Sequence, residues 1–208
     1  MWQHYDTIFT ELAVDTGGRT RLVSAMALQK PATMWVSHLP SDATFVFGLL
    51  HGVYPMAPAP SGDHSLGMSG MAIYLKYGPM LRALQGRVWN LEGHSISASI
   101  DKASFGAVND SARGGSEIGV DANLFDLPDG TSIAVLALRG ATTATVTVKI
   151  ARLAAESAAT PAPNAISLDA LQLGRAETWT PIKASSGLVQ LEIQSTIAML
   201  RIADPTAI

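Results

Sequence analysis

The stretch Thr143-Ala144-Thr145-Val146-Thr147-Val148-Lys149-Ile150 alternates polar and apolar residues without interruption. A period of two places the apolar residues on one face of a half-buried strand. The same alternation occurs at residues 96–100 and 189–194, whereas residues 133–138 form the continuous apolar run of a more central strand. Short segments of this kind recur at roughly 8–12-residue spacing and are separated by turn signals such as Pro128-Asp129-Gly130, so they predict an antiparallel β-sandwich.

The first 94 residues have a different composition. All five histidines, all four tyrosines and three of the four tryptophans lie in this part. Helical and strand patterns alternate here, as in α/β proteins. Asp42 would cap one of the helices. Gly78-Pro79 would break or kink another, and Pro79 would fit the first position of a helix that runs to about Trp89. The predicted helices cover residues 20–30, 43–50 and 74–89, and the predicted strand covers residues 33–39.

These patterns predict an α+β protein with two parts. Residues 1–92 would form a short, partial α/β part that resembles a piece of a barrel. Residues 93–208 would form an antiparallel β-sandwich that serves as an accessory domain. The chain has 208 residues, and a complete (β/α)₈ barrel needs roughly 250, so we expect only the end of a barrel.

Composition excludes several classes of protein. The absence of cysteine excludes disulfides, thiolate metal sites and a cysteine nucleophile. The net charge of −3 gives no basic surface for nucleic acid. No apolar run is long enough to cross a membrane, and the first residues lack the pattern of a secretory signal, which favours the cytoplasm.

The segment 54–67 is the candidate site loop. Its three prolines within six residues exclude a helix and a central strand, and an ordered loop of this length is often functional. Within it, Asp63 and His64 would orient a polar ligand such as a sugar. The alternative is an Asx turn at Asp63 beside an exposed histidine. Aromatic surface and further substrate contacts would come from Tyr54, Trp35 and His51.

Glu11 is the best candidate for an acid or base, with Asp63 as the second catalytic carboxylate. Two carboxylates about 5–10 Å apart are what glycoside hydrolysis requires. For Asp15, a capping or surface role is favoured. A serine nucleophile at Ser65 or Ser69 is a weaker alternative, because the G-x-S-x-G pattern is not met.

We expect no metal and no cofactor. His38, His51 and His64 lack the spacing of a zinc motif, which favours structural roles for them. The pair Gly17-Gly18 lacks the lysine of a phosphate-binding loop.

The order of segments resembles the C-terminal portion of a glycoside hydrolase, in which the end of a (β/α)₈ barrel passes directly into an antiparallel β-sandwich. Residues 33–39, 54–67 and 74–89 resemble the barrel end. Residues 123–130, 133–138 and 198–202 resemble the sandwich. The resemblance implies a carbohydrate-active protein that cleaves glycosidic bonds of an oligo- or polysaccharide. No family motif matches residue by residue, so it assigns no catalytic residue.

Two further functions stay open at this point. The chain could be a carbohydrate-binding or interaction module without turnover, or, with less support, an ester hydrolase. Surface left open by a partial barrel would also favour association with another copy of the chain.

Overall fold

The computed structural model describes residues 8–11, 29, 32–35, 41–56, 68–90, 96–104, 118–151, 167–173, 178–185 and 188–203. The chain divides into two compact units, Met1–Trp89 and Asn90–Ile208. The sequence placed this division between residues 92 and 93.

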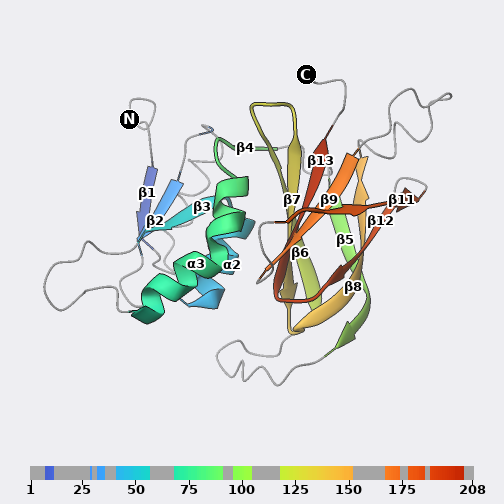
Figure 1. Ribbon diagram of the computed structural model, residues 1–208, viewed down its shortest axis with the longest axis horizontal. Helices are drawn as coiled ribbons and strands as arrows, with labels where there is room; N and C mark the ends of the chain where they lie inside the picture. Colours follow the sequence, from blue (N-terminus) through green and yellow to red (C-terminus); the bar gives the residue numbers. More distant parts are fainter. Residues whose placement is uncertain are drawn as a thin grey trace, which may run out of the picture. The chain divides into compact units, whose positions relative to one another are not determined.

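In the N-terminal unit, three short parallel strands lie side by side in the order β1-β2-β3 (Figure 1). Two helices and a short strand complete the described part of the unit. The elements are β1 (Ile8–Glu11), β2 (Ala32–Trp35), α2 (Asp42–Leu50), β3 (Val53–Met56), α3 (Met68–Ala83) and β4 (Val88–Trp89).

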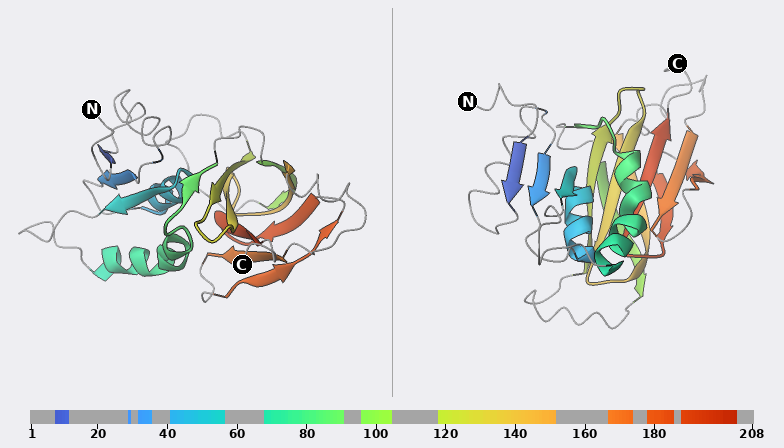
Figure 2. Two further views of the ribbon diagram at one scale, coloured as in Figure 1. Left: turned by 90° about the horizontal axis from the view of Figure 1, so that it is seen from above. Right: turned by 60° about the vertical axis from the view of Figure 1, so that its left-hand side comes forward.

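The C-terminal unit is built from antiparallel strands. One sheet has the order β10-β9-β13-β7-β6 and the other the order β11-β12-β8-β5, and their inner faces enclose one core (Figures 1 and 2). The strands are β5 (Ile96–Ser104), β6 (Gly119–Asp126), β7 (Ser132–Arg139), β8 (Thr143–Ile150), β9 (Ser167–Gln172), β10 (Thr180–Ile182), β11 (Ala184–Ser185), β12 (Leu188–Ile193) and β13 (Ile197–Ala203).

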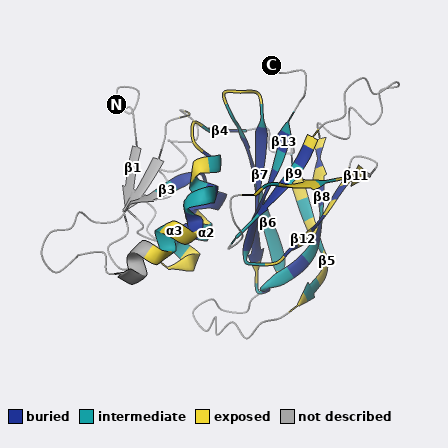
Figure 3. Cartoon of the chain, viewed as in Figure 1, coloured by how far each residue is buried: buried dark blue, intermediate teal, exposed yellow. Residues whose placement is uncertain are grey.

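The alternating segments of the sequence form strands of this unit, as predicted. In β8, Ala144, Val146, Val148 and Ile150 are buried in the core between the two sheets, and the residues between them are not fully buried. β7 lies between β13 and β6, and residues 132–138 are buried without a break (Figure 3). The continuous apolar run therefore marks a central strand, as expected.

A β-bulge in β5 explains where the alternation of that strand changes phase. The register with β8 shifts between Ile100 and Lys102, which leaves Asp101 as the extra residue. A strict period of two would place Ile100 and Ala103, three positions apart, on opposite faces of the strand. Because the bulge adds one residue between them, both side chains pack against the core.

The predicted turn Pro128-Asp129-Gly130 joins β6 to β7. Gly130 has a φ of 81°, which glycine adopts without strain. The Asp129 carboxylate accepts a hydrogen bond from the backbone amide of Thr131 at 2.9 Å. This bond and the side-chain hydrogen bond of Thr131 lower the pKa of Asp129.

The predicted α+β class with a barrel-like N-terminal part is wrong. The protein is rich in β-structure and mostly antiparallel, and the described residues contain only two helices of more than one turn and no barrel. The described parallel sheet has three strands of four residues each, whereas a barrel of this type closes with eight strands. The predicted helix at residues 20–30 lies outside the described residues, apart from Gln29 in a turn.

Three local predictions for the N-terminal unit also need correction. Ser41, not Asp42, is the N-cap of α2, because the Ser41 hydroxyl accepts from the Thr44 amide at 3.3 Å. Pro79 lies inside α3. Leu75, four residues earlier, is 72% exposed, so water can replace the missing amide donor. The loop predicted from Tyr54 onward begins later, because β3 extends to Met56. Among the described strands β3 lies at an edge of its sheet, where a proline such as Pro55 is tolerated.

Candidate functional site

The carboxyl ends of the parallel strands bring two predicted site residues together. Glu11 is the last residue of β1, Trp35 is the last residue of β2, and the two are register partners. Met56, at the end of β3, continues the same row. Neighbouring strands lie about 4.8 Å apart, so Glu11 and Trp35 occupy adjacent positions at one edge. In open α/β sheets, ligands bind outside the carboxyl ends of the strands where the strand order reverses; the described order β1-β2-β3 is sequential.

Two other predicted site residues, Asp63 and His64, lie outside the described residues, as do Ser65 and the segment 57–67. This segment follows β3 directly, and so begins at the carboxyl edge of the sheet. Ser69 lies in the first turn of α3, where its side chain is not described.

Tyr54 lies on β3 and has well-defined contacts. Its hydroxyl donates a hydrogen bond to the Leu84 carbonyl at 3.2 Å. The Arg87 guanidinium lies 4.0 Å from the centre of its ring. These contacts join β3 to the turn that follows α3, and a role of Tyr54 in substrate binding stays a prediction.

His51 is the C-cap residue of α2. Its backbone carbonyl accepts a hydrogen bond from the Trp89 indole Nε1 at 2.9 Å. Its ring lies against Phe47, with 4.4 Å between the ring centres. The proposed substrate contact of His51 is therefore not tested by these contacts, which fix the end of the helix.

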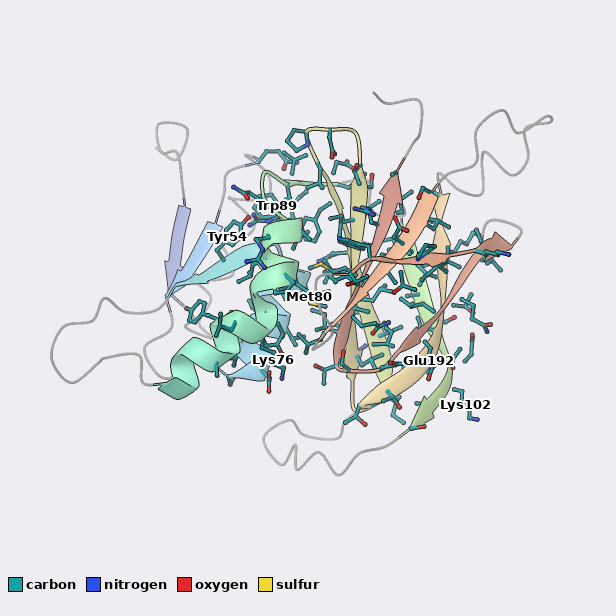
Figure 4. The ribbon with its side chains drawn as sticks, in the orientation of Figure 1. Tyr54, Lys76, Met80, Trp89, Lys102 and Glu192 are labelled. Atoms are coloured by element: carbon teal, nitrogen blue, oxygen red, sulfur yellow. The ribbon has the colours of Figure 1, made fainter. Side chains whose placement is uncertain are left out.

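Sequence reasoning did not single out Arg87, the residue that holds this region together. Its guanidinium donates to the Gly52 carbonyl through Nη2 and to the Leu84 carbonyl through Nη1 at 3.5 Å. It also lies over the rings of Tyr54 and Trp89, and both of these residues are seen near the end of α3 in Figure 4. No periodicity marks such a residue; the only sequence signal is a basic side chain two positions before a tryptophan.

Arg87 has an unusual electrostatic environment. Burial lowers the pKa of its guanidinium, because the charged form loses hydration. Its Nε is buried and has no hydrogen-bond partner, and no carboxylate pairs with it among the described residues. The aromatic faces and the carbonyls at the end of α3 take the place of an anion, because both carry partial negative charge.

A side-chain amide extends the same region. Gln29 has a left-handed backbone with a φ of 51°. Its amide nitrogen donates to the Trp89 carbonyl and its amide oxygen accepts from the Trp89 amide, both at 2.8 Å. The Gln29 side chain thus pairs with the backbone of Trp89 as a neighbouring strand would. This pairing holds Trp89 in place beside Arg87.

The two helices are joined by a polar and aromatic cluster. One carboxylate oxygen of Asp42 accepts from Lys76 Nζ and from the Tyr77 hydroxyl, both at 2.7 Å. Phe45 stacks on Tyr77 with 4.9 Å between the ring centres. Burial alone raises the pKa of Asp42, but the hydrogen bonds from Lys76 and Tyr77 outweigh it and lower the pKa below its usual value.

No group of three or more metal-ligating side chains occurs in the described part of the chain. Of the predicted structural histidines, His38 and His64 lie outside the described residues. None of the helices that the structure describes is long and apolar enough to span a membrane.

Comparison with known proteins adds no family. No family model matches the chain, and no curated protein matches it.

Proposed function

We propose that this chain is a carbohydrate-active protein whose site lies at the carboxyl ends of β1 and β2. The observation that carries the proposal is the register pairing of Glu11 with Trp35. A carboxylate accepts hydrogen bonds from sugar hydroxyls, and an indole ring offers a large apolar face with a polar edge. Two residue types suited to a sugar ring therefore occupy neighbouring positions at the carboxyl edge of the parallel sheet.

The proposed reaction is hydrolysis of a glycosidic bond. Glu11 would protonate the oxygen that leaves with the departing sugar, and Asp63 would either attack the anomeric carbon or deprotonate the attacking water. Carboxylates about 5 Å apart would give retention of the anomeric configuration, and carboxylates about 6.5–9.5 Å apart would give inversion.

Chain geometry allows Asp63 to take this role. Asp63 is seven residues beyond Met56, the last residue of β3, and seven extended residues span at most about 25 Å. The distance from β3 to β1 is only two strand spacings, about 10 Å. The segment after β3 is thus long enough to bring a carboxylate to Glu11.

The proposal is tested by assaying the full chain against chromogenic glycosides. We expect turnover by the wild type and a loss of at least about a hundredfold in Glu11→Gln, the low end for removing a general acid or base. Asp63→Asn should lose a similar factor. Glu192→Gln is the matched control, because Glu192 is an exposed glutamate on β12, and it should keep full activity. Full activity in Glu11→Gln would reject Glu11 as the acid or base.

A binding function without turnover is the second candidate. It is favoured by the single carboxylate, Glu11, in the described residues of the three parallel strands, whereas hydrolysis requires two. This candidate predicts saturable sugar binding that is lost in Trp35→Ala, with no product formed by the wild type. Product formation that depends on Glu11 and Asp63 would reject it.

A further inference from the structure

The C-terminal unit contains a tryptophan outside its hydrophobic core. Trp179 precedes β10 directly, and it is half-buried. A tryptophan at such a position can pack in the core or serve as an aromatic platform for a ligand. The core between the two sheets consists of aliphatic side chains and does not include Trp179. Its ring instead lies against a charged group, the Arg201 guanidinium, 4.7 Å from the ring centre.

An ion pair holds that guanidinium in place. Arg201 donates to one carboxylate oxygen of Asp169 through Nη2 at 2.7 Å and through Nε at 3.3 Å. Arg201 on β13, Asp169 on β9 and Pro181 on β10 are register partners in adjacent strands, and Trp179 comes two residues before Pro181. Three paired strands therefore position the indole, the guanidinium and the carboxylate.

The three side chains remain partly open to solvent. The side chain of Arg201 is 36% exposed and that of Asp169 is 13% exposed. The cluster thus offers one aromatic ring, unused guanidinium donors and carboxylate acceptor capacity. An aromatic face beside fixed donors and acceptors is suited to a sugar ring, which has apolar C–H faces and a rim of hydroxyls.

Charge decides which sugars fit. The charge of Arg201 is compensated by Asp169, whose carboxylate lies 2.7 Å from the guanidinium. An anionic sugar would have to compete with the Asp169 carboxylate for the guanidinium, so the cluster favours a neutral sugar.

We propose that Trp179, Arg201 and Asp169 form a binding subsite for a neutral sugar unit of an oligo- or polysaccharide. The choice of ligand class rests on the proposed carbohydrate function. Arg201 covers one face of the indole and fixes its orientation, and the sugar packs against the remaining exposed surface of the ring. The subsite lies in the C-terminal unit and binds polysaccharide without taking part in its cleavage.

Affinity electrophoresis of the full chain tests this subsite. We run native gels that contain mixed-linkage β-glucan, xylan or galactomannan. At least one of these polysaccharides should retard the wild type. In Trp179→Ala and Arg201→Met, the association constant should fall at least about tenfold, as when an anchor residue is removed from a binding site. Lys183→Ala, an exposed change next to β10, is the control and should migrate as the wild type does. Circular dichroism and thermal melting identify any variant that does not fold.

A second readout does not depend on the folding of an alanine variant. The chain contains four tryptophans, so ¹⁵N-labelled protein gives four indole signals, and Trp179→Phe identifies the signal of Trp179. We expect the sugar that retards the wild type to shift this signal in a saturable way. An unshifted Trp179 signal at saturating sugar would overturn the subsite.

The outcomes separate this subsite from the proposed site at Glu11 and Trp35. Retardation that is lost in Trp179→Ala but kept in Trp35→Ala supports the subsite, even if no glycoside is cleaved. Retardation that is lost in Trp35→Ala but kept in Trp179→Ala overturns the subsite and leaves the proposed function in place. Absence of retardation by all three polysaccharides also overturns it, and glycoside cleavage in that case leaves the proposed function in place.

Discussion

Replacing Arg87 by methionine should destabilise the N-terminal unit, since this residue links β3, the end of α3 and β4. Methionine keeps much of the apolar stem but removes every donor and the positive charge. The Gly52 carbonyl would lose the donor that Arg87 supplies. The Leu84 carbonyl would lose less, because it also accepts from the Tyr54 hydroxyl.

The magnitude follows from these contacts. An unsatisfied buried carbonyl costs about 1–3 kcal/mol, and Gly52 is buried. The lost contact of the guanidinium with the Tyr54 ring adds about 0.5–2 kcal/mol. Part of this cost is offset, because Arg87 no longer buries a charge with an unpaired Nε. We therefore expect a net loss of about 2–3 kcal/mol in the free energy of unfolding.

Urea denaturation followed by tryptophan fluorescence measures this loss, because Trp89 lies 5.7 Å from the Arg87 guanidinium. Arg87→Lys should fall between the wild type and Arg87→Met, since lysine keeps the charge but not the planar fork of donors. Gln85→Met, an exposed change in the same turn, is the control and should stay within about 0.5 kcal/mol. A stability of Arg87→Met equal to that of the control would refute the role given to Arg87.

Two further predictions concern stability. Asp42→Asn should cost about 1 kcal/mol or less at pH 7, because this ion pair is largely exposed. The folded-state pKa of Asp42 is lowered, so its contribution is present above the ordinary value of 3.8 and is lost as the pH falls through the folded-state pKa. Thermal melts of the variant and the wild type should therefore converge in acid, and a constant difference would contradict this. Leu136→Ala should cost about 2–5 kcal/mol in urea denaturation, because it opens a cavity in the core. Leu188→Ala, at a residue that is 42% exposed, should cost less than about 1 kcal/mol.

The strands of the C-terminal unit were predictable because the alternation of polar and apolar residues lies within each short segment of sequence. At residues 143–150 and 188–193, each position is either buried against the facing sheet or directed away from it, and a period of two records that difference. The bulge at Asp101 was not predictable, since it appears only as a change of register against β8. The order of strands in each sheet likewise depends on pairings between residues far apart in the sequence.

The N-terminal unit was predicted less well because its signals compete. Pro79 is a strong helix-breaking signal, yet α3 continues through it where solvent can satisfy the freed carbonyl. Ser41 and Asp42 are both good capping residues; Ser41 takes the cap, and the Asp42 carboxylate instead accepts from Lys76 and Tyr77.

The candidate site was predicted in part. The residue types of Glu11 and Trp35 suggested carbohydrate chemistry, but only the parallel register brings them together. For Arg87 the only local signal is its position two residues before Trp89, because its contacts with Gly52 and Tyr54 lie more than thirty positions earlier in the chain.

The most direct test of the proposed site is the distance between the carboxyl groups of Glu11 and Asp63 in a crystal structure of the chain with a bound oligosaccharide. The proposed reaction requires a separation of about 5–10 Å, with the scissile bond between the two groups. A separation beyond about 15 Å, or a sugar bound away from Glu11 and Trp35, would contradict carboxylate-based hydrolysis at the carboxyl ends of β1 and β2.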